Sequence, residues 1–287
     1  MRGYKPLRSF LTLLWLSASS ERMTMTLIRN RLGLLVLGVL VTFVLYLLLP
    51  AIQHERFTAR LDDSKPLAME ERSQQDANTT VLTGTIEGDP PILYREAFLL
   101  QKAGTPSPKR LDVIFLHGQA FTSKTWEDLG TLALLSEEGY RPIAIDLPGF
   151  GSSPRSDAVS TEQGRVGLLQ RVLKELSIHK PVLVSPSMSG RYSIPFLLAH
   201  GAELKGFVPI APVGTKDHPA QQYQEVQTPT LIIYGDRDTG LGTQSLQSLQ
   251  QIPKHQTAAL RDAGHACYLD RPREFHEVLL SFLGELK

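Results

Sequence analysis

A nucleophilic serine is predicted at residue 187, where an apolar run turns into a helical stretch. The segment reads Val182-Leu183-Val184-Ser185-Pro186-Ser187-Met188-Ser189-Gly190. A reactive serine on a sharp strand-to-helix turn needs small residues two positions before and two positions after it, commonly as G-x-S-x-G. Serines stand at both of those glycine positions here, which is a sterically mild change. The segment therefore predicts an exposed, activated hydroxyl above the end of a strand.

Three serines of this segment compete for the role, and their neighbours separate them. Ser185 is followed by proline, which has no N–H, although the residue after the nucleophile must donate one to the oxyanion hole. Ser189 would place the bulky Arg191 at the second small position. Ser187 has small residues on both sides, and the N–H of Met188 follows it. The alternative interpretation is an ordinary serine-rich helix N-cap.

The turn after another apolar strand predicts the second half of an oxyanion hole. It reads Phe115-Leu116-His117-Gly118-Gln119-Ala120, and the backbone N–H of Gln119 is the best candidate donor. Losing one such donor typically costs ~2.7–4 kcal/mol of transition-state stabilisation. His117 belongs to the strand end, so we expect it to orient the turn rather than to act as a base.

An acid and a base follow two later apolar runs. Asp236 and Asp238 come directly after the run 231–234. Asp238 lies further into its loop, where it can reach and hold an imidazole, whereas Asp236 beside a glycine is typical of a turn. His265 lies in a glycine-containing loop before the last helical stretch. Cys267, two residues later, lacks a strand-to-helix turn and is predicted to be a small buried residue.

From residue 81 onward, short β-branched runs alternate with helical stretches. The expected strands are residues 81–86, 92–96, 113–117, 142–146, 182–185, 206–210, 230–234 and 257–260. The expected helices are residues 125–138, 161–176, 188–200, 243–251 and 272–286. Such alternation predicts an α/β fold with a mostly parallel central sheet and helices on both faces. That sheet would bring the ends of its strands, and the residues after them, to one edge.

Ser187, Asp238 and His265 occur in that chain order, each in a loop after a predicted strand. Ser…Asp…His is the order of the α/β-hydrolase fold. Residues 81–287 resemble an α/β-hydrolase-fold serine hydrolase. The segments that carry the resemblance are Thr125-Trp126-Glu127, Leu129-Gly130-Thr131-Leu132, Asp146-Leu147-Pro148-Gly149-Phe150-Gly151, Ser185-Pro186-Ser187, Gly206-Phe207-Val208-Pro209-Ile210-Ala211-Pro212 and Gly264-His265-Ala266-Cys267-Tyr268-Leu269. The resemblance implies a Ser187/Asp238/His265 catalytic triad and a single-pass type II anchor.

The activity expected of such a protein is cleavage or transfer of an acyl group from an ester, thioester or amide. Only about 18 residues separate the strand near Ala211 from the one near Thr230, where many hydrolases insert a lid. A minimal lid predicts an open site, and hence a small acyl group or a substrate presented by a protein or a membrane. The expected substrate is a small molecule or an acylated protein. Transfer to a thiol or amine instead of water is one alternative. The other is a catalytically silent binding or signalling protein, since fold does not fix function.

A membrane anchor is predicted at residues 32–52, a run of 21 residues without a charged side chain. About 20 such residues span a bilayer core. Arg29 and Arg31 precede the run directly and favour a cytosolic N-terminus. Residues 1–20 also resemble a cleaved signal peptide, which would reverse the topology and leave the large domain in the cytosol. In the type II topology the sequon at Asn78 would be glycosylated.

Composition excludes several function classes. Thirty basic residues balance 29 acidic ones, so no electrostatic footprint for nucleic acid is present. One cysteine excludes an internal disulfide framework and any cysteine-based metal site. No motif requires a metal or an organic cofactor. The expected organisation is a tail at 1–31, the anchor at 32–52, a polar stalk at 53–80 and the α/β-hydrolase domain at 81–287.

Overall fold

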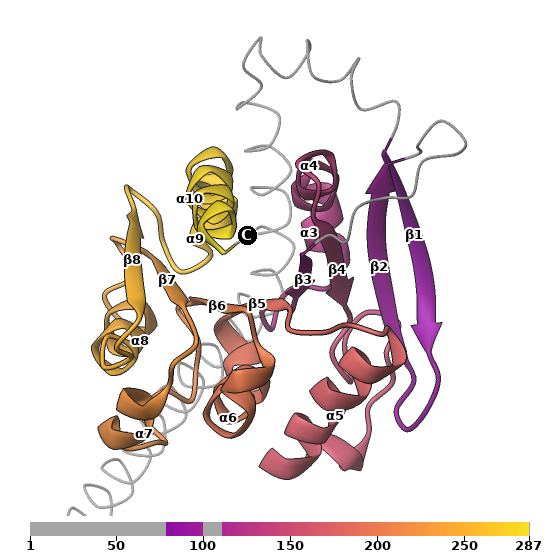
Figure 1. Cartoon of the computed structure of the whole chain (residues 1–287), viewed down its shortest axis with the longest axis horizontal. Helices are drawn as coiled ribbons and strands as arrows, with labels where there is room; N and C mark the ends of the chain where they lie inside the picture. Colours follow the sequence, from indigo (N-terminus) through magenta and orange to yellow (C-terminus); the bar gives the residue numbers. More distant parts are fainter. Residues whose placement is uncertain (1–78, 100–110, 287) are drawn as a thin grey trace, which may run out of the picture. The chain divides into compact units, whose positions relative to one another are not determined.

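The computed structural model describes residues 79–99 and 111–286, which belong to one compact unit, Gln74–Lys287. Eight strands of this part form one sheet in the order β1-β2-β4-β3-β5-β6-β7-β8 (Figure 1). The strands are β1 (Thr79–Ile86), β2 (Ile92–Leu99), β3 (Asp112–Phe115), β4 (Arg141–Ile145), β5 (Val182–Pro186), β6 (Gly206–Ile210), β7 (Thr230–Gly235) and β8 (His255–Leu260). Every predicted strand has a counterpart, so the predicted α/β sheet is confirmed.

Most of the sheet is parallel, with an antiparallel hairpin at one edge. β1 pairs with β2 in antiparallel register, and β2 continues antiparallel onto β4. From β4 through β3, β5, β6 and β7 to β8 all pairings are parallel. The carboxyl ends of these strands therefore lie along one edge of the sheet. In open α/β sheets this edge is where ligands bind, and the loops that carry the predicted site residues all leave from it.

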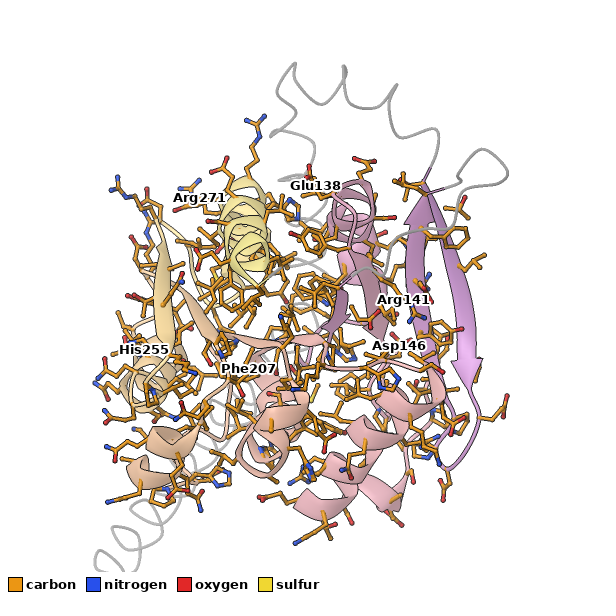
Figure 2. The ribbon with its side chains drawn as sticks, in the orientation of Figure 1. Glu138, Arg141, Asp146, Phe207, His255 and Arg271 are labelled. Carbon is orange, nitrogen blue, oxygen red and sulfur yellow. The ribbon has the colours of Figure 1, made fainter. Side chains whose placement is uncertain are left out.

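Helices cover both faces of the sheet (Figure 1). On one face lie α3 (Lys124–Asp128), α4 (Thr131–Glu137), α9 (Cys267–Asp270) and α10 (Pro272–Glu285). On the other lie α5 (Glu162–Glu175), α6 (Gly190–His200), α7 (Ala220–Glu225) and α8 (Leu241–Leu249). Side chains fill the space between sheet and helices on both sides (Figure 2).

The hydrophobic core consists of two clusters, one on each face of the sheet. Along β3, Val113 and Phe115 pack with the α3, α4 and α10 side, whereas Ile114 packs with the α5 and α6 side. This alternation follows from the period of two in a β-strand. Because both faces are covered, the strand reads as a continuous apolar run, as predicted.

Three local predictions differ from the structure. The helix expected over 125–138 is split into α3 and α4, because Gly130 adopts a left-handed φ of 75° that an uninterrupted α-helix cannot contain. β1 begins at Thr79, two residues inside the predicted stalk, because its pairing with β2 extends to Thr79↔Leu99. The short helices α7 and α9 were not predicted, since six- and four-residue helices show too little periodicity.

The predicted anchor at 32–52, the alternative signal peptide at 1–20 and the sequon asparagine Asn78 lie outside the described residues. Within residues 79–99 and 111–286, none of the helices has the length and apolar character that crossing a membrane requires. The anchor, its orientation and the glycosylation of Asn78 therefore remain predictions.

The connection between β6 and β7 is short. Residues 211–229 contain one six-residue helix, α7, and no inserted lid domain. This agrees with the minimal lid expected from the sequence. The β6–β7 connection therefore adds no separate domain over the carboxyl edge of the sheet.

Candidate active site

The three residues predicted to form a triad are hydrogen-bonded in series. His265 Nε2 lies 2.8 Å from Ser187 Oγ, and His265 Nδ1 lies 2.6 Å from Asp238 Oδ2. A carboxylate oxygen only accepts, so Nδ1 carries the imidazole proton and Nε2 is left to accept from the serine hydroxyl. The structure thus brings together one residue from each of the loops after β5, β7 and β8, in an order that can move a proton from serine to histidine.

Ser187 has a strained backbone. Its φ is 50°, in the left-handed region that non-glycine residues rarely occupy. Such a conformation costs about 1–3 kcal/mol and persists only where the surroundings enforce it. Gly190 is part of that enforcement, because a Cβ on it would lie 2.3 Å from the carbonyl oxygen of Val213. The missing side chain lets the start of α6 sit directly against the loop after β6.

The direction of the Met188 N–H is set by the hydrogen bond that the Ser187 carbonyl, in the same peptide unit, accepts from Val213. The N–H of Val213 donates to the carbonyl oxygen of Ser187 at 2.9 Å. In a trans peptide the C=O and the following N–H point in opposite directions. The Met188 N–H therefore points away from Val213, as an oxyanion donor beside Ser187 must.

The turn that carries Gln119 lies against the same serine. A Cβ placed on Gly118 would be 3.6 Å from the Cβ of Ser187, so the two backbones are in van der Waals proximity. Gln119, the next residue, is exposed. The turn that precedes Gln119 therefore packs against Ser187, and the role of Gln119 and Met188 as oxyanion donors stays a prediction.

His117 and Asp146 hold this turn in place. His117 is buried; its Nε2 accepts from the N–H of Leu147 at 3.0 Å, and its Nδ1 donates to the Gly118 carbonyl at 2.8 Å. Burial lowers the pKa of His117, which keeps the ring neutral with both nitrogens used. Asp146 accepts from the N–H of Ser123 at 2.8 Å. The prediction that His117 orients the turn agrees with these contacts.

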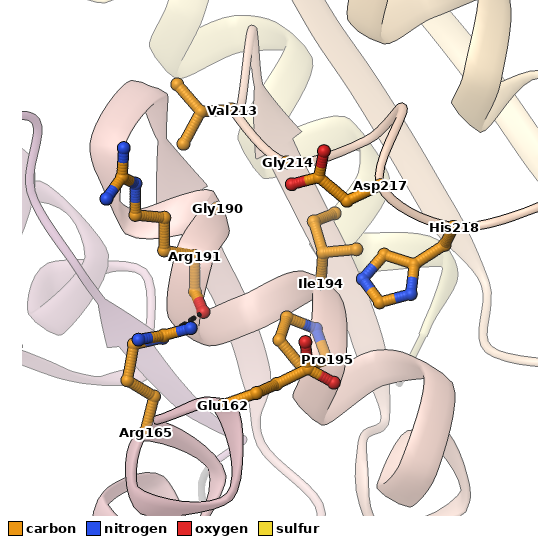
Figure 3. Close-up of a pocket in the computed structure, with 10 residues that line it drawn as sticks. All are labelled: Glu162, Arg165, Gly190, Arg191, Ile194, Pro195, Val213, Gly214, Asp217 and His218. Carbon is orange, nitrogen blue, oxygen red and sulfur yellow. Dashed lines mark hydrogen bonds between the residues drawn. The ribbon is translucent and has the colours of Figure 1, made fainter. Parts of the chain in front are cut away.

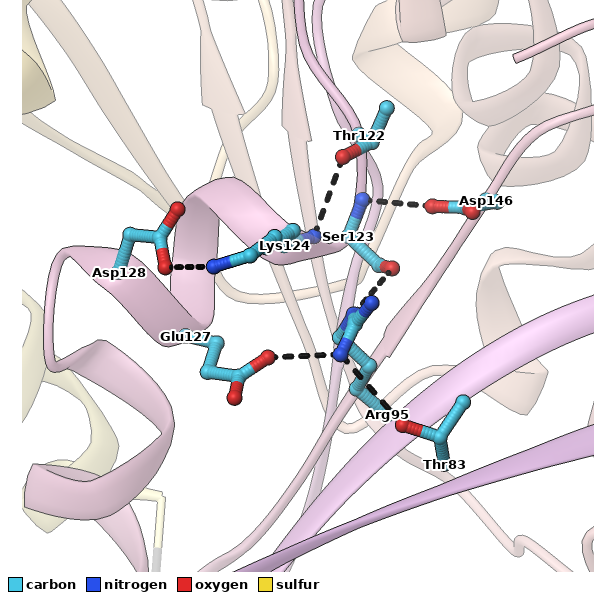
Figure 4. Close-up of polar contacts among 8 residues, drawn as sticks. All are labelled: Thr83, Arg95, Thr122, Ser123, Lys124, Glu127, Asp128 and Asp146. Atoms are coloured by element: carbon cyan, nitrogen blue, oxygen red, sulfur yellow. Dashed lines mark hydrogen bonds and ion pairs between the residues drawn. The ribbon is translucent and has the colours of Figure 1, made fainter. Parts of the chain in front are cut away.

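The far end of the turn is tied to the hairpin at the sheet edge (Figure 4). Arg95 of β2 donates to Ser123 Oγ at 3.2 Å and forms a 2.7 Å ion pair with Glu127 of α3. Ser123 is thereby held on its N–H by Asp146 and on its side chain by Arg95. The antiparallel hairpin therefore supports the loop that carries Gln119, the predicted oxyanion donor.

The loops of the acid and the base are joined along their backbones. The N–H of Arg237 donates to the Ala263 carbonyl at 3.0 Å. Gly235 has no room for a side chain, because a Cβ would lie 2.2 Å from the carbonyl oxygen of Gly264. This close approach places His265 within reach of Asp238.

The environments of Asp238 and His265 differ sharply. The Asp238 side chain is only 8% exposed, whereas that of His265 is 43% exposed. Gly242 packs on the Asp238 side chain, since a Cβ there would lie 2.9 Å from the Asp238 Cβ. Asp236, the rejected alternative, is exposed. The buried Asp238 carboxylate holds the imidazole at Nδ1, while much of the His265 side chain remains exposed to solvent.

Comparison with known proteins adds to this geometry. Residues 113–221 match the model of the alpha/beta hydrolase family. Protein ABHD14A of Danio rerio is 50% identical over 91% of this chain and 99% of its own length. Protein ABHD14A of Mus musculus is 49% identical over 90% of this chain and 97% of its own length. The chain belongs to the ABHD14A family of α/β-hydrolases. The resemblance inferred from the sequence is confirmed.

One further relative and two solved structures are also similar to this chain. ABHD14B of Rattus norvegicus, named as a candidate protein-lysine deacylase, is 44% identical over 73% of this chain and 99% of its own length. A CIB-like hydrolase from Thermoplasma acidophilum superposes with a TM-score of 0.65 at 22% identity, over 72% of this chain and 99% of that chain. Carboxylesterase CesB from Bacillus subtilis superposes with a TM-score of 0.60 at 18% identity, over 74% and 95%. At these identities the solved structures show the fold alone.

The single cysteine of this ABHD14A family member is not a competing nucleophile. Cys267 is fully buried, and burial raises the pKa of its thiol to about 12. The thiolate is the reactive form, so near neutral pH this side chain remains a small apolar group. Beside it, Tyr268 stacks on Trp126 with ring centroids 4.8 Å apart, which packs the histidine loop onto α3.

A polar cavity of about 210 Å³ lies at the start of α6 in this family member (Figure 3); Ser187, Asp238 and His265 are not among the residues that line it. Four charged side chains and one histidine line it, namely Glu162, Arg165, Arg191, Asp217 and His218. Gly190 and Val213, which shape the backbone at Ser187, form part of the same wall. No sequence pattern indicates this cavity, because its lining comes from the start of α5, the start of α6 and the loop before α7.

Proposed function

We propose that this protein is a serine hydrolase that cleaves or transfers an acyl group through Ser187, His265 and Asp238. Membership of a hydrolase family supports hydrolysis in general. The observation that carries the finer assignment is the hydrogen-bonded series from Asp238 through His265 to Ser187, with the serine on a left-handed turn. Activation of a weak nucleophile by an adjacent, oriented base is the general arrangement of covalent acyl transfer.

The proposed first half-reaction forms an acyl-enzyme. Ser187 Oγ attacks the carbonyl carbon of the substrate while His265 Nε2 takes its proton. Asp238 stabilises the resulting imidazolium, and the N–H groups of Met188 and Gln119 donate to the developing oxyanion. As the tetrahedral intermediate collapses, His265 returns the proton to the departing alcohol, thiol or amine. Ser187 then carries the acyl group as an ester.

The second half-reaction reverses these roles. His265 removes a proton from an incoming water, which attacks the acyl carbon of the ester. Collapse of the second tetrahedral intermediate breaks the bond to Ser187 Oγ, which recovers its proton from His265. The carboxylic acid leaves and the enzyme is regenerated. A thiol or amine in place of water would make the same chemistry a transfer.

The substrate class we propose is a short acyl group on a polar carrier. The minimal β6–β7 connection and the 43% exposure of His265 favour a substrate that approaches from solvent or from another macromolecule. The cavity at the start of α6 is lined by charged side chains, which suit a polar carrier better than a long alkyl chain. The name of ABHD14B, a candidate protein-lysine deacylase, adds acyl-lysine amides to the esters and thioesters worth assaying.

Reaction of the full-length protein with a fluorophosphonate probe tests the proposal. Such a probe phosphonylates an activated serine, and peptide mass spectrometry locates the adduct. We expect one adduct, on Ser187, and none on Ser185 or Ser189 of the same peptide. A denatured sample is the control, because it keeps every hydroxyl but loses the His265 contact. Absence of an adduct in the folded protein would overturn the proposal and favour the silent binding protein.

We also propose that residues 32–52 hold the enzyme on a membrane with its N-terminus in the cytosol. The 21-residue uncharged run supports a single span, and Arg29 and Arg31 support this orientation. In cell membranes washed with alkaline carbonate, we expect the full chain to stay in the pellet and to shift on glycosidase treatment, with the shift lost in Asn78→Gln. Release into the supernatant would contradict anchoring, and a pelleted chain without the shift would favour the opposite topology.

A further inference from the structure

Three serine side chains form a buried row beneath Ser187. Ser185 lies at the end of β5, Ser189 in the turn after Ser187, and Ser193 in the first part of α6; all three are 0% exposed. Ser185 Oγ lies 2.6 Å from Ser193 Oγ and 2.9 Å from Ser189 Oγ. Ser189 Oγ in turn lies 2.7 Å from the carbonyl oxygen of Pro186.

The direction of each hydrogen bond in this row follows from proton counting. A hydroxyl has one proton to donate, and the carbonyl of Pro186 can only accept, so Ser189 spends its proton there. Ser189 must then accept from Ser185. Ser185, having spent its proton on Ser189, must accept from Ser193. The row therefore runs in one direction, from Ser193 through Ser185 and Ser189 to the Pro186 carbonyl.

The end of the row fixes one of the two peptide planes that flank the strained serine. The Pro186 carbonyl belongs to the peptide plane that contains the Ser187 nitrogen, and φ of Ser187 is the rotation away from that plane. The other flanking plane contains the Ser187 carbonyl, which accepts from the N–H of Val213 at 2.9 Å. With both planes held, Ser187 cannot relax its φ of 50° by rotating either neighbour.

We propose that Ser185, Ser189 and Ser193 are positioning residues that hold Ser187 in its reactive conformation through this directed row of hydrogen bonds. The inference rests on the proposed function, because it assigns these hydroxyls to the serine nucleophile. It explains why serine stands at both positions of the G-x-S-x-G pattern where glycine is common: the hydroxyls supply a contact to the Pro186 carbonyl that glycine has no atoms to make.

A simpler explanation makes the opposite prediction. If serine stands at positions 185 and 189 only because it is small, then alanine, which is smaller, would serve equally well. If the hydroxyls hold the turn, alanine loses the contact without introducing any clash. Replacement by alanine therefore separates the two explanations, and no enlarged side chain is needed.

The test is a set of single alanine variants of the full-length protein. For each variant we would measure the rate constant of fluorophosphonate labelling, kcat and KM for a short activated ester, and the melting temperature. Ser189→Ala is expected to lower the labelling rate and kcat on the order of 10²-fold, the usual result of misplacing a reacting group by about 1 Å. Ser193→Ala, two contacts further away, is expected to cost about fivefold, as for one lost hydrogen bond. KM is expected to stay unchanged, since no substrate contact is removed.

Ser136→Ala is the matched control for removing a buried serine hydroxyl. Ser136 of α4 is also 0% exposed, but its hydroxyl has no hydrogen-bond partner within residues 79–99 and 111–286. It is expected to label at the wild-type rate. Ser193→Thr keeps a hydroxyl at the head of the row and is expected to label faster than Ser193→Ala. A purely structural role would lower the melting temperature of the alanine variants but leave the rate per folded molecule unchanged.

The outcomes distinguish this inference from the proposed function. If the wild-type protein labels at Ser187 and Ser189→Ala labels equally fast, the positioning role is wrong and the serine hydrolase assignment stands. If the wild-type protein does not label at all, the proposed function itself fails. A graded loss, largest at Ser189 and smallest at Ser193, with unchanged KM, would support the positioning row.

Discussion

Replacing Ser187 with alanine is expected to lower kcat on the order of 10⁶-fold, the usual result of removing a serine nucleophile. The variant keeps His265, Asp238 and both N–H donors, so what it loses is the covalent route through the acyl-enzyme. The measurement is hydrolysis of a short activated ester by the full-length protein, together with fluorophosphonate labelling. Ser136→Ala serves as control and is expected to retain wild-type rates, because its hydroxyl has no hydrogen-bond partner in the described part of the chain.

No neighbouring serine can replace Ser187 in that variant. Ser185 and Ser189 are fully buried, and their protons are committed within the row that ends on the Pro186 carbonyl. Among the serines of the described chain, the one hydrogen-bonded to His265 Nε2 is Ser187. Labelling that persisted in Ser187→Ala would therefore show that the nucleophile has been assigned to the wrong residue, and not that a second serine had taken over.

The choice of Ser187 shows what local sequence can predict. The argument from the missing proline N–H and from small neighbours uses only residues adjacent in the chain, and the geometry it requires is local. Ser187, Asp238 and His265 could likewise be predicted as a set, because each follows an apolar run and parallel strands bring their ends to one edge. The structure then places them within hydrogen-bonding distance of one another.

What sequence could not predict depends on contacts between distant segments. Val213 holds the Ser187 carbonyl from the loop after β6, and a Cβ on Gly190 would lie 2.3 Å from the Val213 carbonyl oxygen and 2.8 Å from the Pro212 Cβ. Ser193 reads as an ordinary polar residue of a helix until its hydroxyl is seen 2.6 Å from Ser185. Arg95 supports the oxyanion turn from β2, 28 residues before its partner Ser123. No periodicity or spacing signals such pairs, because they arise only when the chain has folded.

Replacing Asp238 with asparagine is expected to lower kcat about 10⁴-fold, the loss seen when a triad carboxylate becomes an amide. The Asp238 side chain is 8% exposed and accepts from His265 Nδ1 at 2.6 Å. An amide can turn its NH₂ group toward Nδ1, which makes Nδ1 the acceptor and leaves the ring proton on Nε2. Ser187 then faces a donor instead of a base. Steady-state hydrolysis of a short activated ester would measure the loss, and KM is expected to change little because the substrate contacts are intact.

Asp236→Asn is the matched control for this variant. Asp236 lies in the same loop, two residues earlier. Asp236→Asn also replaces a carboxylate with an amide, but at an exposed position. It donates its N–H to the Leu260 carbonyl, a backbone contact that the substitution preserves. Its kcat is expected to stay within about twofold of the wild type, as for an ordinary surface change. If Asp236→Asn lost activity and Asp238→Asn did not, the acid would be Asp236, and the imidazole would have to turn away from the carboxylate that now holds it. Because Gly242 of α8 packs on the Asp238 side chain and Asp238 Oδ2 lies 2.6 Å from His265 Nδ1, we expect the loss to fall on Asp238 alone.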